Sequence, residues 1–267
     1  MKTANVSLID LIVEEKYAKV KKILSGEQKR IYVKFKDQTT RKEVRKNVGV
    51  IYDVNEKDCC NRTVLMYAII SEQNGIAREL IKQGADITVT DDFGVTFVGL
   101  CAEGNCHKLL KFALDKHCET FNKMLVNKPY GSFLSYPIII ATGRGHYETA
   151  ELLLKAGADP NVRNHEDKLP IQWPIASSDD KMVSLLLKYG ARADLLTHHG
   201  ETLLLFSLGN NFPEGQGIST KLLFATVKCE NAKAILEEAY EHAIKCRNYP
   251  LIDQIMCELR DLKISKR

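Results

Sequence analysis

Cysteine and histidine side chains that stand close together are the residues with the clearest capacity for chemistry. Cys101 and Cys106 are separated by four residues, His107 follows directly, and the pair His117-Cys118 comes later. Thiolate and imidazole groups are the ligands that Zn²⁺ prefers, so this group raises a zinc hypothesis. The spacing matches no common zinc finger, and helical periodicity places Cys101 on one helix and Cys106 at the start of the next, where small buried residues are expected. We therefore predict no metal site.

The other reactive groups also lack the pattern that catalysis requires. The pair Cys59-Cys60 belongs to no C-x-x-C motif and is predicted to be an exposed thiol pair. The glycine-rich segment 209–217 carries no Lys-Ser/Thr and follows no strand, so it is not a phosphate loop. An enzyme site with Cys229, His242 or Cys246 stays an alternative, but no spacing supports it. We predict no catalytic residue and no cofactor.

The composition is that of a globular protein made and kept in the cytoplasm. Of the 267 residues, 45% are hydrophobic and 27% are charged, close to the average for globular proteins. No stretch approaches the roughly 18 apolar residues of a membrane span, and Asp10, Glu14 and Glu15 stand where a signal peptide needs apolar residues. Eight cysteines without a regular framework predict free thiols. The length allows two ordinary domains or one elongated domain.

Three segments end on the same short motif, each after an apolar run of helical spacing. A glycine adopts the left-handed conformation that closes a helix, so each motif predicts a helix end. The three copies are Gly84-Ala85-Asp86, Gly157-Ala158-Asp159 and Gly190-Ala191-Arg192-Ala193-Asp194.

A second landmark repeats 21 residues before these glycines. The same phase finds Thr63, Thr96, Tyr136, Leu169 and Thr202, whose spacings are 33, 40, 33 and 33 residues. The period is therefore 33 residues with one seven-residue insertion before Tyr136. Each landmark is predicted to open a helix, because threonine is a good N-cap and proline is tolerated at the next position. The prolines are Pro137 and Pro170, and the turn residues two positions before the landmarks are Asn61, Gly94, Asp167 and Gly200.

A 33-residue unit of a turn and two short helices resembles the ankyrin repeat. The best copy begins with Tyr136-Pro-Ile-Ile-Ile-Ala141, which is similar to the T-P-L-H-x-A motif, and runs to Asn161. The histidine of that motif is replaced in every copy, so the hydrogen-bond ladder that it provides in the family should be absent. Its replacements are Met66, Gly99, Ile139, Gln172 and Leu205.

The resemblance implies one elongated all-α domain, an ankyrin-repeat solenoid of helix-turn-helix units with short hairpin loops and one inserted basic β-finger. Two amphipathic stripes near the C-terminus suit a closing helix pair. The predicted segments are an N-terminal helical cap at 1–25, the basic finger at 26–57, ankyrin repeats at 58–208 (approximately 58–90, 91–130, 131–163, 164–196 and 197–217) and a C-terminal helical cap at 218–267.

The predicted finger concentrates the basic charge. From Lys16 to Lys46 the net charge is +9, whereas the whole chain carries +4. Residues 31–36 alternate apolar and polar side chains, and they and residues 48–52 are predicted to form two paired strands. Clustered lysines attract polyanions such as nucleic acid or phosphoinositides, but they also protect an exposed strand edge from aggregation. The polyanion hypothesis rests on Lys34, Lys36, Arg41, Lys42, Arg45 and Lys46.

Two sets of residues are candidates for binding a partner protein. The variable position of T-P-L-H-x-A forms a ladder with the period of the repeat, and it is either an exposed row rich in aromatic anchors or a partly buried apolar row. The hairpin tips point toward the ligand in this family. The ladder residues are Tyr67, Leu100, Ile140, Trp173 and Phe206, and the tip residues are Asp92, Phe93, His165, Glu166, His198 and His199.

The other insertions, 128–134 and 209–217, are rich in glycine and asparagine and are predicted to be flexible surface loops. The aromatic residues Tyr130, Phe133 and Phe212 on them are either contact anchors or packed on neighbouring helices.

The resemblance implies a non-catalytic protein-protein interaction module that binds another protein, with no membrane span, as a monomer in the cytoplasm. By analogy alone, the chain is similar to ankyrin proteins that intracellular bacteria deliver into a host cytoplasm. The alternative function is binding of an acidic or phosphate-bearing partner by the finger.

Overall fold

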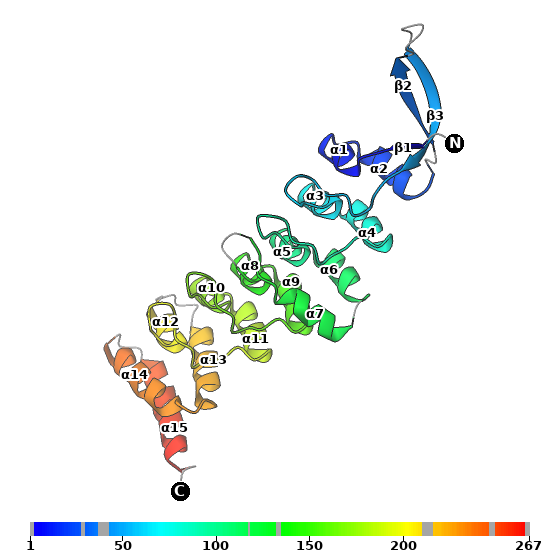
Figure 1. Ribbon diagram of the computed structural model, residues 1–267. Coiled ribbons are helices and arrows are strands. Elements are labelled where there is room, and N and C mark those ends of the chain that lie inside the picture. Colours follow the sequence, from blue (N-terminus) through cyan, green and yellow to red (C-terminus); the bar gives the residue numbers. More distant parts are fainter. Residues whose placement is uncertain are drawn as a thin grey trace. The chain divides into compact units, whose positions relative to one another are not determined.

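The structure, a computed structural model, describes residues 3–27, 30–36, 43–116, 118–131, 135–209, 216–245 and 249–264. The chain divides into two compact units, residues 1–132 and 133–267. Apart from one small sheet near the N-terminus, both units are built from short helices (Figure 1). None of the helices in the described ranges has the length and apolar content of a membrane span.

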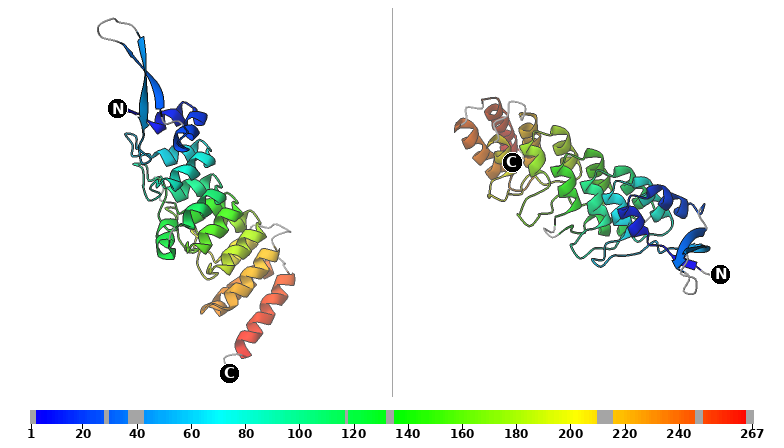
Figure 2. Two further views of the ribbon diagram at one scale, coloured as in Figure 1. Left: turned by 90° about the vertical axis from the view of Figure 1, so that its right-hand side faces the viewer. Right: turned by 90° about the horizontal axis from the view of Figure 1, so that it is seen from above.

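The first unit contains helices that stack in pairs. The first helix of each pair contacts the first helix of the next, α1 with α3 and α3 with α5, and the second helices follow the same order. Both views of Figure 2 show the α3–α4 and α5–α6 pairs side by side. The helices of this unit are α1 (Leu8–Val13), α2 (Tyr17–Leu24), α3 (Val64–Ile70), α4 (Asn74–Lys82), α5 (Phe97–Glu103), α6 (His107–Leu114) and α7 (Glu119–Val126).

Three strands of this unit form a sheet in the order β1-β3-β2. Strands β2 (Arg30–Lys36) and β3 (Glu43–Ile51) are antiparallel, in a register that pairs Lys34 with Arg45. The second strand is longer than the segment 48–52 that the sequence predicts. A strand that was not predicted, β1 (Thr3–Asn5), pairs parallel with the end of β3.

The helices of the second unit also stack in pairs. Contacts run from α8 to α10 to α12 through the first helices, and from α11 to α13 through the second. The last two helices, α14 and α15, pack on each other and extend beyond the predicted amphipathic stripes. The helices are α8 (Pro137–Gly143), α9 (Tyr147–Lys155), α10 (Gln172–Ala176), α11 (Asp180–Lys188), α12 (Leu203–Gly209), α13 (Gln216–Val227), α14 (Ala232–Lys245) and α15 (Tyr249–Ile264).

Most of the predicted helix ends are confirmed. Gly84, Gly157 and Gly190 have φ of 91°, 90° and 93°. After each of them the next N–H donates to a carbonyl of the last helical turn, as in Ala85 to Leu80 at 2.9 Å. At the other end, the Thr63 side chain accepts the N–H of Met66 at 3.3 Å. Thr96 and Thr202 cap α5 and α12 in the same way.

One predicted helix start is wrong. Leu169 was expected to open a helix with Pro170 at its first position, but α10 begins at Gln172. The buried Gln172 side chain accepts the N–H of Leu169 through Oε1 at 2.6 Å, so it binds the N–H of the landmark residue, whereas a threonine cap binds an N–H of the first helical turn. The leucine side chain has no oxygen to cap a helix, and the N–H of Gln172 donates instead to the carbonyl of Leu169 at 3.2 Å in a tight turn before the helix.

The core lies between the first and second helices of each pair. Fully buried leucines recur at one position of the second helices, Leu80 in α4, Leu153 in α9 and Leu186 in α11. Each such side chain contributes roughly 1.5–3 kcal/mol through the removal of apolar surface from water. Because one 33-residue unit cannot bury its own apolar face, neighbouring pairs complete the core.

Asparagine side chains join successive repeats within each unit. Asn55 Oδ1 accepts the N–H of Asp86 at 2.8 Å, and Asn161 Oδ1 accepts the N–H of Arg192 at 2.8 Å. Asn161 also donates to the carbonyl of Gly190 at 3.0 Å. These bonds fix the orientation of one hairpin relative to the next.

Candidate protein-binding surface

Four hairpins are each built around one side-chain oxygen that stands five residues before the helix-opening landmark; the hairpin before Tyr136 has Gly131 at this position. Asp58 Oδ1 accepts the N–H groups of Cys60 and Arg62, both at 2.8 Å. Asp91, Asn164 and Thr197 accept from the residues two and four positions further along in the same way. The turn then passes through the left-handed residues Asn61, Gly94, Asp167 and Gly200, as predicted. The tips are therefore shaped by local hydrogen bonds.

Arg62 organises the exposed tip of the first unit. Its Nε lies 3.2 Å from Oδ2 of Asp91, whose side chain is completely buried. Its guanidinium carbon lies 5.9 Å from the ring centroid of Tyr67 and 5.6 Å from that of Phe93, distances at which cation–π attraction operates. The Phe93 side chain is 51% exposed. We call Arg62, Tyr67, Asp91 and Phe93 the arginine cluster.

Hydrogen bonds in and beside the arginine cluster shift the pKa values of Asp58, Tyr67 and Arg62. Burial raises the pKa of Asp58, but hydrogen bonds from the Tyr67 hydroxyl and from backbone N–H groups outweigh it, so the pKa lies below its usual value. The Tyr67 hydroxyl donates to Asp58 Oδ2 at 2.8 Å, which raises the pKa of Tyr67. The hydrogen bond to Asp91 likewise raises the pKa of Arg62. The cluster therefore presents one cation, held by Asp91, within cation–π distance of two aromatic rings.

Asp92, one of the predicted tip residues, makes hydrogen bonds within the protein through its side chain and its backbone N–H. Its Oδ1 accepts from Asn61 Nδ2 at 2.7 Å, and its N–H donates to the carbonyl of Cys60 at 3.0 Å. Cys59 is exposed and Cys60 half-buried, with 3.9 Å between their sulfur atoms. The neighbouring Cys59 thiol raises the pKa of Cys60.

Leu100 is the ladder residue that the structure places in the core. The adjacent Gly99, which stands where the family has histidine, lies under the ring of Tyr130 from the insertion. A Cβ at Gly99 would come within 1.8 Å of Tyr130 Cδ2. The Tyr130 hydroxyl also donates to Glu103 Oε2 at 2.5 Å. Of the two alternatives for Tyr130, packing on a neighbouring helix is confirmed, whereas Phe133 and Phe212 lie outside the described residues.

The other tip cluster, in the second unit, surrounds Trp173. Lys168 Nζ lies 5.6 Å from the Trp173 ring centroid and pairs with Glu166 at 2.8 Å. Gln172 Nε2 lies 3.1 Å from His198 Nδ1, within hydrogen-bond distance. The expected absence of a hydrogen-bond ladder therefore has one exception, because glutamine at this position still reaches the next hairpin.

The remaining predicted residues of the second unit lie around this cluster. The rings of His198 and His199 are 3.8 Å apart, and His165 and Glu166 are exposed. Ile140, Trp173 and Phe206 are half-buried on α8, α10 and α12. These ladder side chains are therefore only partly exposed to a partner. Their role in binding stays a prediction.

Sequence reasoning missed three residues that organise these tips. Arg62 and Lys168 stand next to predicted aromatic residues in space, and Gln172 links two hairpins. Arg62 and Lys168 stand one position before the landmarks Thr63 and Leu169, so the repeat phase itself carried the signal.

The other sequence hypotheses concern metal and polyanions. Cys101 is fully buried in α5, as predicted, and burial raises its pKa well above the usual value. Within the described ranges, no three His, Cys, Asp or Glu side chains could hold a metal ion. Lys34 and Lys36 lie in β2, and Arg45 and Lys46 lie in β3, whereas Arg41 and Lys42 lie outside the described residues.

A family model for ankyrin repeats (3 copies) matches residues 65–164 and 98–198, which together span half of the chain. The chain belongs to the ankyrin repeat family. Ankyrin repeats are generally binding modules without catalytic activity. The predicted fold class, an all-α ankyrin repeat protein, is confirmed.

Individual ankyrin proteins are similar to this chain at low sequence identity. NF-kappa-B inhibitor alpha of Gallus gallus is 28% identical over 161 residues, 59% of this chain and 49% of that protein. Inversin of Canis lupus familiaris is 23% identical over 161 residues, 60% of this chain and 14% of its own length. The chain thus spans half or less of these relatives. The crystal structure of the ankyrin repeat protein EF0377 has a TM-score of 0.60 at 22% identity, covering 81% of this chain and 96% of the other.

Proposed function

We propose that the chain is a non-catalytic module that binds a partner protein through its hairpin tips and the exposed edges of the ladder residues. The observation that carries this proposal is the arginine cluster. Arginine and aromatic side chains are enriched among the residues that dominate binding energy at protein interfaces. Asp91 and the two rings hold the Arg62 side chain in place before binding, so less conformational entropy is lost when a partner arrives.

The tips of the second unit supply a second contact region of the same kind. Trp173 offers one aromatic edge, Lys168 covers it, and His165, Glu166 and His199 are exposed beside it. The mixture of an aromatic centre and a polar rim is typical of protein interfaces. Ankyrin-repeat membership supports recognition of a protein rather than of a small substrate.

Replacing Phe93 by alanine is expected to weaken partner binding more than fivefold, or about 1 kcal/mol, because the exposed ring and its contact with Arg62 are both lost. The matched control is Met124→Ala in α7, where a side chain of similar exposure, 58%, is removed from another part of the same unit. The full chain first captures its partner by crosslinking, and titration calorimetry with the purified partner then measures both variants. Equal affinities of the two variants would disprove a role for the arginine cluster.

A second candidate function is binding of a polyanion by the finger. It is favoured by the net charge of +9 between Lys16 and Lys46 and by the register of β2 and β3, in which two basic residues, Lys34 and Arg45, are cross-strand partners. Contacts between basic side chains and phosphates or sulfates release counterions, so affinity must fall steeply as salt rises.

The full chain is expected to bind heparin, with an affinity that falls at least tenfold between about 50 and 200 mM salt. Lys34→Gln combined with Arg45→Gln should reduce the slope of log affinity against log salt. Lys108→Gln combined with Lys111→Gln in α6 removes the same charge elsewhere and should leave the slope unchanged. Heparin binding that is independent of salt, or equally affected by both pairs, would exclude the finger as the polyanion site.

A further inference from the structure

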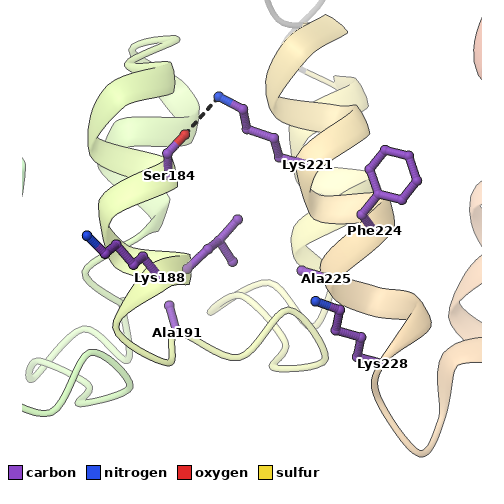
Figure 3. A pocket seen from close by; sticks show the side chains of 8 residues that line it. Ser184, Lys188, Ala191, Lys221, Phe224, Ala225 and Lys228 are labelled. Carbon is purple, nitrogen blue, oxygen red and sulfur yellow. Dashed lines mark hydrogen bonds between the residues drawn. The ribbon is translucent and has the colours of Figure 1, made fainter.

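A groove runs along the second helices of two successive repeats, away from the first helices that carry the ladder. It lies between α11 and α13, entirely within the second unit, and encloses about 450 Å³ (Figure 3). On α11 and the turn after it, the lining residues are Ser184, Leu187, Lys188 and Ala191. On α13 and the turn after it, they are Lys221, Phe224, Ala225 and Lys228.

One side of the groove follows the spacing of a helix. On α13 and the residue that follows it, the lining residues stand at positions i, i+3, i+4 and i+7, which is one helical face over about 10.5 Å, whereas α11 ends at Lys188 and Ala191 lies in the turn after Gly190. Leucine and alanines form an apolar floor along this length. A second helix lying in such a groove presents its own side chains at the same spacing. The geometry therefore favours a helical occupant.

Three lysines give the groove its charge. Lys221 extends from α13 toward α11, where it donates to Ser184 Oγ at 2.7 Å and pairs with Asp180 (Figure 3). Lys188 and Lys228 lie near the other end of the groove and, among the described residues, have no ion pair. Asp180 pairs with Lys221, whereas Lys188, whose ammonium lies 5.8 Å from the Tyr189 ring centroid, and Lys228 are exposed at the rim of the groove. A ligand with carboxylates complements them.

Phe224 gives the groove an apolar edge. The side chain is 55% exposed, although it is flanked on the same face by lysine ammonium groups. A nucleic acid or phosphate ligand would satisfy the lysines but leave the ring and the leucine in water. Only a ligand that carries apolar and acidic groups together buries both features of the groove.

We propose that the α11–α13 groove is a second docking site, which binds an acidic amphipathic helix of another protein. Apolar residues of that helix lie on the floor and against Phe224, and its glutamate or aspartate residues face Lys188 and Lys228. The site shares no residue with the hairpin tips or with the finger.

The probe for this proposal is a helical peptide with leucines at i, i+3, i+4 and i+7 and glutamates at the flanking positions, titrated with the full chain by fluorescence anisotropy. We expect binding that weakens at least tenfold between about 50 and 300 mM salt. Lys188→Glu combined with Lys228→Glu should weaken it at least tenfold at low salt, and Phe224→Ala should weaken it about fivefold. The residues replaced in both variants are exposed, and a thermal melt checks that the variants are folded.

Two comparisons make the test decisive. Lys181→Glu combined with Lys233→Glu changes the net charge equally but outside the groove, and it should retain binding within about twofold. A peptide with serine in place of leucine should lose at least tenfold in affinity. Absence of binding up to about 1 mM peptide, equal loss in both lysine pairs, or equal binding of the serine peptide would overturn the proposal, and the last result would indicate a polyanion site instead.

Discussion

Gly99→Ala is expected to destabilise the first unit by about 1–3 kcal/mol, although alanine is the better helix former. Gly99 lies within α5, and a Cβ there would overlap the ring of Tyr130, coming within 1.8 Å of Cδ2 and 2.3 Å of Cγ. These atoms are close to the backbone of Tyr130, so a rotation of the ring cannot relieve the overlap. The insertion must shift, and the hydrogen bond from Tyr130 to Glu103 is lost.

The sign of this effect should reverse when Tyr130 is absent. In a Tyr130→Ala background, Gly99→Ala has no ring to displace and should stabilise the protein by up to about 1 kcal/mol, the helix preference of alanine over glycine. Gly143→Ala in α8 is a matched control, since its nearest contact with Trp173 would be an ordinary 3.8 Å. Urea denaturation of the wild type, Gly99→Ala, Tyr130→Ala and the double variant measures the coupling. The same destabilisation in both backgrounds would disprove the ring contact as its cause.

This pair of residues also shows where sequence reasoning reaches its limit. Gly99 replaces the histidine of the repeat motif. From the sequence, this replacement predicts only the loss of a hydrogen bond. In the structure it is the space that an insertion 31 residues later fills with an aromatic ring. No local pattern links Gly99 to Tyr130, because the contact depends on the path of the chain through α6 and α7. Helix α7 was itself not predicted.

Features that depend on a few neighbouring residues were predictable. The glycine helix ends, the threonine caps and the left-handed turn residues all follow from the conformational preferences of single residues, and the structure confirms them. The 33-residue period was enough to identify the repeats because each local rule recurs in the same phase. Leu169 departs from this pattern, because leucine cannot cap a helix and its own N–H is accepted by the side chain of Gln172, three residues later.

The candidate site was predictable only in part. Tyr67 and Phe93 were identified from their positions in the repeat, but Arg62, which lies within cation–π distance of both rings, was not. Its partner Asp91 belongs to the next hairpin, 29 residues along the chain. Spacing places residues on a face or at a tip, whereas the pairing of a cation with two rings and one buried carboxylate depends on how successive hairpins meet.

The same buried carboxylate provides the second large expected effect. Asp91→Ala should lower the free energy of unfolding by about 2–4 kcal/mol, because it removes the acceptor for two backbone N–H groups and the partner of Arg62. The Asp91 side chain is fully buried, so water cannot replace the lost oxygen without opening the hairpin. Arg62 is 28% exposed and can be rehydrated, which limits the cost.

Asp91→Asn separates the two roles of this side chain. Asn164 occupies the equivalent position of another hairpin and accepts the corresponding N–H groups at 3.0 and 2.9 Å with its amide oxygen. Asparagine at 91 should therefore retain the turn and lose only the attraction to Arg62, about 1 kcal/mol. Asp92→Ala, the exposed neighbour, should cost less than about 1 kcal/mol. Chemical denaturation ranks the variants, and an equal loss for Asp91→Ala and Asp91→Asn would mean that the charge, rather than the backbone acceptor, holds the hairpin.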